Sequence, residues 1–229
     1  MASVTQQKIP PLENGDRLSR EEFERRYDAM PGLSKAELIE GVVYLPSPVR
    51  LRQHGRPHAH LVHWLVSYED ATEGVIVADN ASVRLDLANE PQPDAALLID
   101  PGWGGQARIS DDDYIEEAPE LVAEVVASSA SFDLGTKLKV YRRNGVREYV
   151  VWRVRDRQID WFVLRGRRYV PLAIDAEGLY RSRGFPGLWL NPAALIRGKR
   201  AIVSAVLQRG LASREHADFV ARLNRRRNP

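Results

Sequence analysis

Two acids and a lysine are the residues in this sequence with the clearest capacity for chemistry. Asp94 stands immediately before the apolar run at residues 95–99, and Glu124 lies inside the apolar run at residues 121–126. Lys137 follows a short polar stretch after the second run. Two carboxylates on neighbouring buried elements can bind a divalent cation, and a lysine beside them can orient water or stabilise negative charge. We therefore expect these three side chains to meet at one site.

Glu124 is informative because its neighbours are apolar. A short apolar run bounded by turn residues predicts a buried strand, and strand alternation places Val122, Glu124 and Val126 on one face. A lone carboxylate in an apolar interior is strongly destabilising or becomes protonated, unless a cation compensates its charge. An ion pair with an arginine, or an edge-strand position that reaches solvent, would also satisfy Glu124. The residue alone therefore leaves a metal site and a structural role open.

Lys137 requires a helix to bring it back to the two acids. Asp133 is a suitable helix N-cap and Asn144-Gly145 a suitable stop, which predicts about three turns with Lys137 and Tyr141 on one face. The chain has few lysines for its many arginines, and lysine, unlike arginine, can lose its proton when it is buried. A solvated helix lysine is the alternative interpretation.

Several short motifs follow one another in order along residues 36–189. They are ELIEG at 37–41, Ser47-Pro48 with His54, Pro93-Asp94, ELVAEV at 120–125, Asp133 with Lys137 and Tyr141, GVREY at 145–149, and FPGLW at 185–189. As a series they resemble the Uma-type family of bacterial restriction-endonuclease-like proteins, within the PD-(D/E)XK nuclease superfamily. The resemblance covers most of the chain.

The resemblance implies an α/β (α+β) restriction-endonuclease-like fold, with a mixed central β-sheet flanked by helices. The acids of the first two superfamily motifs bind magnesium, and Asp94 and Glu124 stand at those positions. Val126 stands two residues after Glu124, where the superfamily has lysine, so the lysine role would pass to Lys137. The backbone carbonyl of Val125 is a further expected metal ligand.

A glutamate from the N-terminal part of the fold would complete the site. A strand over residues 38–45 would place Glu37 and Glu40 on opposite faces, so that only one of them points inward. The resemblance favours Glu37, and Glu40 is the competing choice. His54 matches a family histidine that would touch the phosphate or position water, although a solvent-facing histidine at a helix start is the more ordinary interpretation.

Composition sets limits on the function. The chain has 229 residues and a net charge of +2. It contains no cysteine, and this excludes disulfides, thiolate metal sites and a cysteine nucleophile. Four of its five histidines lie within residues 54–63, but without cysteine, and with poor spacing, they do not predict a zinc site. No segment is apolar enough to span a membrane, and residues 1–8 lack the apolar core of a signal peptide. We expect a cytoplasmic bacterial protein.

The expected organisation has three parts: a polar lead-in at residues 1–18, a nuclease-like domain at 19–198, and a C-terminal helical extension with a basic tail at 199–229. Within it we expect helices at 19–29, 54–70, 133–144, 202–208 and 213–225, and strands at 38–45, 75–78, 82–87, 94–99, 121–126, 146–154, 159–164 and 169–174. The strands at 75–78 and 82–87 are expected to be joined by a turn at Asp79-Asn80.

These expectations combine into a metal-dependent phosphodiesterase, a DNA endonuclease that uses Mg²⁺, or Mn²⁺ in its place, and no small-molecule organic cofactor. DNA is the expected partner, and a homodimer would allow the two strands to be cut at two sites. The alternative is a catalytically inactive nuclease-fold module that binds nucleic acid or a protein partner. A hydrolase of another phosphoester is a further alternative.

Overall fold

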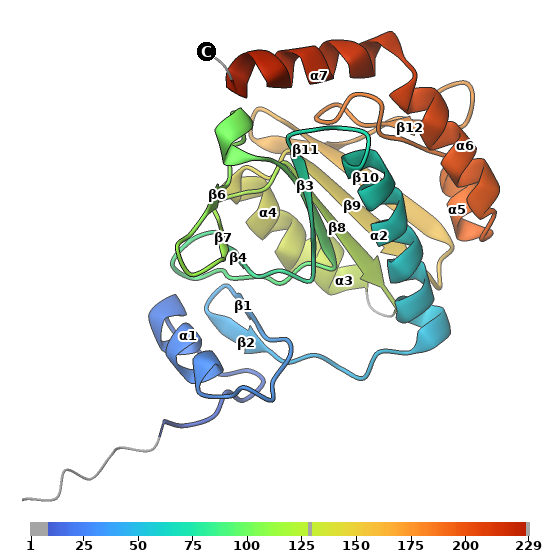
Figure 1. Cartoon of the computed structure of the whole chain (residues 1–229). Helices are drawn as coiled ribbons and strands as arrows, with labels where there is room; N and C mark the ends of the chain where they lie inside the picture. The colour runs from blue at the N-terminus through green and yellow to red at the C-terminus, as the bar shows by residue number, and fades with distance from the viewer. Residues whose placement is uncertain (1–8, 128–129, 228–229) are drawn as a thin grey trace, which may run out of the picture.

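The computed structural model describes residues 9–127 and 130–227 (Figure 1). Residues 1–8, where we expect no signal peptide, lie outside this part of the chain. Figure 1 shows a central sheet with the N-terminal segment near one end and the C-terminal helix α7 over the other. Within residues 9–127 and 130–227, no helix combines the length and the apolarity needed to cross a bilayer.

The central sheet has six strands in the order β11-β10-β9-β8-β5-β3. The strands are β3 (Val75–Asp79), β5 (Ala95–Ile99), β8 (Leu121–Val126), β9 (Glu148–Arg153), β10 (Gln158–Arg165) and β11 (Arg168–Pro171). β8 and β9 pair in parallel and every other neighbouring pair is antiparallel, so the sheet is mixed. The expected mixed sheet flanked by helices is confirmed, and β9, β10 and β11, which correspond to the strands expected at 146–154, 159–164 and 169–174, form an antiparallel meander.

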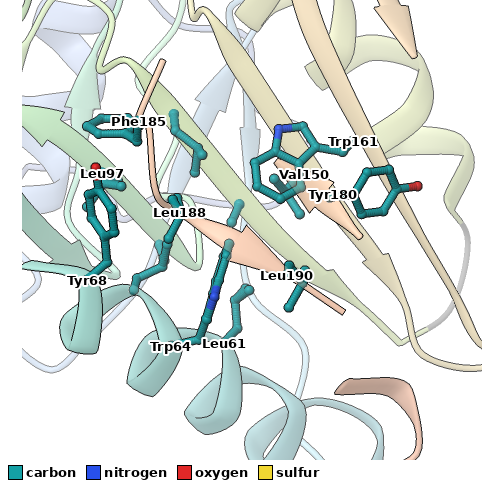
Figure 2. Close-up of a cluster of buried hydrophobic side chains, with 14 of the residues drawn as sticks. Leu61, Trp64, Tyr68, Leu97, Val150, Trp161, Tyr180, Phe185, Leu188 and Leu190 are labelled. Atoms are coloured by element: carbon teal, nitrogen blue, oxygen red, sulfur yellow. The ribbon is translucent and has the colours of Figure 1, made fainter. Parts of the chain in front are cut away.

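The main core lies on one face of this sheet, beneath α2 (Arg56–Glu69). Figure 2 shows Leu61, Trp64 and Tyr68 of α2 among side chains from the sheet and from the segment around Leu188 and Leu190. Leu121, Ala123 and Val125 of β8 point into this core, whereas Val122 packs with Tyr141 and Tyr149 on the opposite face. The expected alternation along β8 is confirmed.

The second face of the sheet is covered by a helical segment with an irregular first half. It consists of α3 (Ala130–Phe132), the π-helical turn η3 (Asp133–Lys137) and α4 (Leu138–Asn144). The prediction that Asp133 caps this helix is wrong, because the helix begins at Ala130 and Asp133 lies inside it. The predicted stop is confirmed, since Gly145 follows Asn144 with a φ of 89°.

The N-terminal segment forms a small unit of its own. Ser19 caps α1 (Arg20–Asp28), the helix expected at 19–29, by accepting a hydrogen bond from the Glu22 N–H at 3.4 Å. β1 (Glu37–Ile39) and β2 (Val42–Tyr44) then form an antiparallel pair. The prediction of one strand over residues 38–45 is wrong, because the chain reverses at Glu40 and Gly41, which have φ values of 54° and 70°.

The remaining strands and connections surround these layers. They are η1 (Leu51–Gly55), β4 (Val83–Arg84), η2 (Pro101–Trp103), β6 (Arg108–Ile109), β7 (Ile115–Glu116), β12 (Tyr180–Arg181) and β13 (Trp189–Leu190). The strands expected at 75–78 and 82–87 do not pair with each other, because β3 pairs with β5 and β4 pairs with β7.

The C-terminal helices pack against the central sheet. They are α5 (Pro192–Ile196), which the sequence analysis missed, α6 (Arg200–Leu211) and α7 (Arg214–Arg227). Val203, Leu207, Phe219 and Leu223 are buried in the same core as α2. The domain boundary at residue 198 stays a prediction, and Val206 of α6 packs in a small cluster with Leu179 and Trp189, which lie before that boundary.

Glu90 is a buried carboxyl outside the group of acids in the catalytic hypothesis. Its protonation makes the stability of the fold depend on pH. Its side chain is 1% exposed, and its backbone N–H and carbonyl both bond to Leu38 of β1, at 2.8 and 3.0 Å. Burial, and then the nearby carboxyl of Glu24, raise the pKa of Glu90 from 4.5 to about 8, against the opposing effect of Arg84. Folding therefore takes up a proton at Glu90 across this pH range.

Substitution of Glu90 by Gln should make stability less dependent on pH. Because the folded pKa lies above the unfolded one, the stabilisation from Glu90 is complete below about pH 4.5 and is lost as the pH rises through about 8. The slope of this loss is up to about 1.4 kcal/mol for each pH unit. Urea unfolding of Glu90→Gln should show a flatter pH profile, whereas Glu21→Gln, at an exposed position, should keep the wild-type slope. An unchanged slope in Glu90→Gln would contradict this account.

Candidate active site

The two acids of the catalytic hypothesis lie side by side in the central sheet. Asp94 immediately precedes β5 and Glu124 lies in β8, and Ala95 of β5 is paired with Ala123 of β8. Both acids are 4% exposed. The antiparallel register therefore brings together two carboxylates that are 30 residues apart in the chain.

Asp94 is held by the backbone of β8 and by the side chains of His54 and Lys35. Its Oδ2 accepts a hydrogen bond from the Val125 N–H at 2.7 Å. Nε2 of His54 lies 3.1 Å from the same oxygen, and Nζ of Lys35 lies 3.5 Å from Oδ1. His54 thus contacts the acid, rather than facing solvent from a helix start. Nothing in the sequence pattern pointed to Lys35, which is 59 residues from Asp94 (94 minus 35).

Glu124 and Glu37 share the ammonium group of Lys137. Nζ of Lys137 donates to Oε1 of Glu124 at 2.9 Å and to Oε1 of Glu37 at 2.8 Å. The hydroxyl of Tyr141 also donates to Oε1 of Glu124, at 3.0 Å, while Oε2 of Glu124 has one long contact, 3.4 Å from the Asp94 N–H. The structure therefore brings Glu37, Asp94, Glu124 and Lys137 together, and it leaves one oxygen of Glu124 largely free.

Asp133 is a further acid of this cluster that the sequence analysis treated only as a cap. Its Oδ1 lies 4.0 Å from Nζ of Lys137, one helical turn away. Burial raises the pKa of Asp133, and Glu37 and Asp94 raise it further, although Lys137 opposes them. The four-residue spacing from Lys137 was the signal that could have identified it.

The charges in the cluster shift one another's proton affinities. Burial alone would raise the pKa of Asp94, but the hydrogen bond with His54 and the charge of Lys35 outweigh it and lower this pKa to about 2. The same hydrogen bond raises the pKa of His54, against the effect of burial. For Glu124, burial and the neighbouring Asp94 prevail over Lys137 and raise the pKa to about 7.

The pKa of Lys137 moves in the direction opposite to the one that burial predicts. Burial favours the neutral amine, but the carboxylates of Glu124, Glu37 and Asp133 prevail and raise the pKa well above its ordinary value. Lys137 therefore stays a protonated ammonium. The alternative of a solvated helix lysine is wrong, because Lys137 is 4% exposed.

Glu40 lies outside the cluster. It occupies the turn between β1 and β2, its side chain is 43% exposed, and it pairs with Arg143 at 2.5 Å. Glu37 begins β1 and points inward, so the geometry separates the two glutamates that the sequence left open. Whether Glu37 takes part in catalysis stays a prediction.

Val125 directs its backbone toward Asp94. The Val126 carbonyl accepts a hydrogen bond from the Val154 N–H at 3.0 Å on the β9 side of the strand. Successive residues of a strand direct their backbone groups to alternate edges, so the Val125 N–H and carbonyl face the β5 edge. The N–H bond to Asp94 agrees with this direction. The role of this carbonyl as a ligand stays a prediction.

The donor set fits a hard divalent cation that keeps part of its hydration shell. Asp94 and Glu124 supply adjacent carboxylate oxygens, and Mg²⁺ commonly binds one or two carboxylates and retains several waters. Within the described part of the chain, no group of three or more Asp, Glu or His side chains is arranged to hold a metal ion. The histidine-rich segment does not add to the set, since His58 bonds to the Asp94 carbonyl at 2.9 Å and to Asp79 at 2.8 Å.

A hollow of about 570 Å³ leads to Asp94 from the surface. Its polar walls include Lys35, His54, His58, Arg50 and Arg155. The buried acids are therefore next to a surface depression that carries mainly positive charge. Such a depression favours a negatively charged ligand over a neutral one.

The chain matches a known protein family over most of its length. The family model Uma2, described as "Putative restriction endonuclease", matches residues 20–193. In fold, the chain is similar to the crystal structure of "a putative nuclease belonging to DUF820" from Anabaena variabilis ATCC 29413. That similarity has a TM-score of 0.52 and 12% identity, and it covers 75% of this chain and 97% of the other. No curated protein matches the chain. The expected family and fold are confirmed.

Replacement of Lys137 by Met should destabilise the fold, because it leaves several buried carboxylates without their shared cation. We expect a loss of about 3–5 kcal/mol in the free energy of unfolding, measured with urea. Lys139→Met removes an exposed lysine from the same helical segment and should change stability by less than about 0.5 kcal/mol. Adding Glu37→Gln to Lys137→Met should restore part of the loss. Equal stability of the two lysine variants would contradict the charge balance described above.

Proposed function

Because the chain belongs to the Uma2 family, described as "Putative restriction endonuclease", we propose that it is a metal-dependent nuclease that hydrolyses phosphodiester bonds in DNA. Family membership supports a nuclease in general, whereas metal dependence, DNA as the substrate and internal cleavage belong to the proposal. The observation that carries it is the pair of adjacent buried carboxylates, Asp94 and Glu124, beside a cationic hollow.

Asp94, the free oxygen of Glu124 and the Val125 carbonyl would hold Mg²⁺, or Mn²⁺ in its place. When bound, the metal lowers the pKa of a bound water and neutralises charge on the phosphate. The Val125 N–H fixes the orientation of Asp94 through its 2.7 Å bond, and Tyr141 and Lys137 fix Glu124 through Oε1. The two ligands are therefore positioned by β8 and its covering helix.

Lys137 acts in this proposal as a fixed positive charge. Its ammonium is buried behind Glu124 and remains protonated, so it orients Glu124 and Glu37 and adds positive potential to the site without accepting a proton. Glu37 also accepts a hydrogen bond from the Gln92 N–H at 2.8 Å, which fixes its position at the rear of the site.

Lys35 and His54 stand between Asp94 and the hollow. Both contact the Asp94 carboxylate, and both line the depression through which a substrate would approach. The ammonium of Lys35 and the ring nitrogen of His54 are placed to bind oxygens of the phosphate group at the point of cleavage. His54 could in addition hold a water molecule there through its ring nitrogen. The proposal keeps the expectation from the sequence that the protein works in the bacterial cytoplasm and that two copies cut the two strands of a duplex.

A catalytically inactive nuclease-fold module is the second candidate, and one observation favours it. Lys137 and His54 already form ion pairs with the carboxylates, and no cluster of three metal-binding side chains occurs within residues 9–127 and 130–227. Such a module would bind nucleic acid or a protein partner through the same hollow. The two candidates differ in whether bond cleavage depends on the acids.

The nuclease proposal predicts cleavage that requires both the acids and a metal. Purified protein with Mg²⁺ or Mn²⁺ should nick a supercoiled plasmid, and EDTA should abolish the activity. Asp94→Asn and Glu124→Gln should each reduce the cleavage rate by more than about 100-fold. This is a larger loss than is typical when a residue that only supports a metal ligand is replaced. Glu40→Gln, which changes an exposed glutamate outside the cluster, should cleave at the wild-type rate.

Calorimetric titration with Mn²⁺ provides a second measurement that does not require turnover. Wild-type protein and Glu40→Gln should bind the ion, and Asp94→Asn and Glu124→Gln should bind it weakly or not at all. Cleavage that persists in both acid variants would indicate a contaminating nuclease and overturn the proposal. Absence of both cleavage and Mn²⁺ binding in the wild-type protein would favour the inactive module.

A further inference from the structure

One long segment of the chain carries no negative charge. From Gly41 to Tyr68 there is no Asp or Glu, although the segment includes three arginines and four histidines. It runs from β2 through η1 into α2, whose start lies near the end of β8 (Figure 1). Arg50, Arg52 and Arg56 are exposed around this helix start. The formal charge of this segment is therefore positive, and its arginines are gathered at the helix start.

A second cationic segment faces the helix start. The turn between β9 and β10 carries Arg155 and Arg157, both exposed, and Arg155 donates a hydrogen bond to Gln53 of η1 at 3.3 Å. The acids of this turn and of β10 do not neutralise these arginines, because Asp156 and Asp160 pair with Arg153 at 2.5 and 2.7 Å. The two segments are therefore in contact, and their arginines remain available to a ligand.

Two hollows share these walls. The hollow of about 570 Å³ that reaches Asp94 includes Arg50 and Arg155, and a second one of about 300 Å³ includes Arg52, Arg56, Arg157 and Arg197. His60 lies in the second hollow, and burial and the charges of Arg200 and Arg56 lower its pKa. The two hollows have no lining residue in common, but residues of the same helix start and of the same β9–β10 turn line both of them, so the hollows are neighbours on the surface.

We propose that Arg50, Arg52, Arg56, Arg155, Arg157 and Arg197 form a basic track that binds the phosphodiester backbone of a nucleic acid strand and leads it away from Asp94. This inference rests on the proposed function and extends it to the route of the substrate. Guanidinium groups bind phosphate oxygens in a bidentate manner and stay charged at every physiological pH. A row of them along a depression matches the repeated charge of a backbone.

A different arginine cluster provides the control for this assignment. Arg147, Arg183 and Arg222 line a hollow of about 310 Å³ that also includes Ile99 and Glu148. Ile99 is at the far end of β5 from Asp94, about 16 Å away at the usual rise of a strand. These arginines are also exposed, and they lie beside a buried acid and remote from the candidate active site. The control variant therefore changes the same number of arginines as the track variant, but at a different place on the surface.

The test compares two triple variants in binding to a short labelled DNA duplex, measured by fluorescence anisotropy in EDTA at several salt concentrations. The track variant is Arg52→Gln/Arg56→Gln/Arg157→Gln, and the control variant is Arg147→Gln/Arg183→Gln/Arg222→Gln. The track variant should bind at least about tenfold more weakly, and the slope of log K against log salt should fall by about 3, one for each lost phosphate contact. The control variant should keep the wild-type affinity and slope.

Equal losses in the two variants, or a larger loss in the control variant, would overturn the track, because net charge alone would then explain binding. Replacing chloride by inorganic phosphate at equal ionic strength tests whether the arginines bind a nucleic acid strand or a single small anion. Strong displacement of the duplex by phosphate would overturn the proposal, and weak displacement supports it. All six substituted residues are exposed, so circular dichroism and thermal unfolding should be unchanged, which confirms that binding losses do not come from misfolding.

The track and the nuclease proposal fail in different ways. Because binding is measured in EDTA, a selective loss in the track variant would support the track even if no cleavage is ever observed. Conversely, if the wild-type protein cleaves DNA and the track variant binds and cleaves equally well, the track is wrong and the nuclease proposal stands.

Discussion

The buried ammonium of Lys137 is the interaction on which the arrangement of acids depends. It lies 2.8 Å from Glu37 and 2.9 Å from Glu124, and Asp133 is at the edge of its reach at 4.0 Å. Several carboxylates cannot stay ionised together in an apolar interior without a cation among them. The charge of Lys137 offsets the repulsion among the neighbouring carboxylates, and these carboxylates in turn keep the lysine protonated. The cluster is therefore a single unit in which no charge can be changed independently.

Other buried acids in the same sheet show what makes Glu124 different. Both oxygens of Glu120 accept backbone N–H bonds, from Ile99 and Gln106 at 3.0 Å each. Glu148 accepts from the Trp161 indole, the Ser182 hydroxyl and the N–H groups of residues 183 and 184. These donors satisfy both carboxylates within the core, so they have structural roles. Glu124 instead keeps one oxygen with a single long contact, on the side of Asp94, and this oxygen can accept a further ligand.

Local pattern predicted the parts of the site that depend on one strand or one helix. The apolar run around Glu124 was sufficient to indicate a buried strand and the face of the acid, and the family resemblance supplied Asp94 and Lys137. The turn at Glu40 was missed because a non-glycine residue with positive φ leaves no strong signal beside a single glycine. Lys35 was missed for a different reason: its contact with Asp94 is set by tertiary packing of the N-terminal unit, which no local pattern reports.

The distribution of charge over the surface, rather than the net charge, is the feature that would allow this protein to bind a polyanion. A net charge of +2 is too small to attract nucleic acid strongly, yet the segment from Gly41 to Tyr68 has no acid at all. The acids that balance the composition lie elsewhere in the chain, and some of them are buried around Lys137 or paired with arginines such as Arg143 and Arg153. Because exposed charges act over about one Debye length, a local surface without acids determines the field that a ligand meets. A nearly neutral chain can thus present a cationic surface next to its buried carboxylates, and the nuclease proposal rests on this separation of opposite charges.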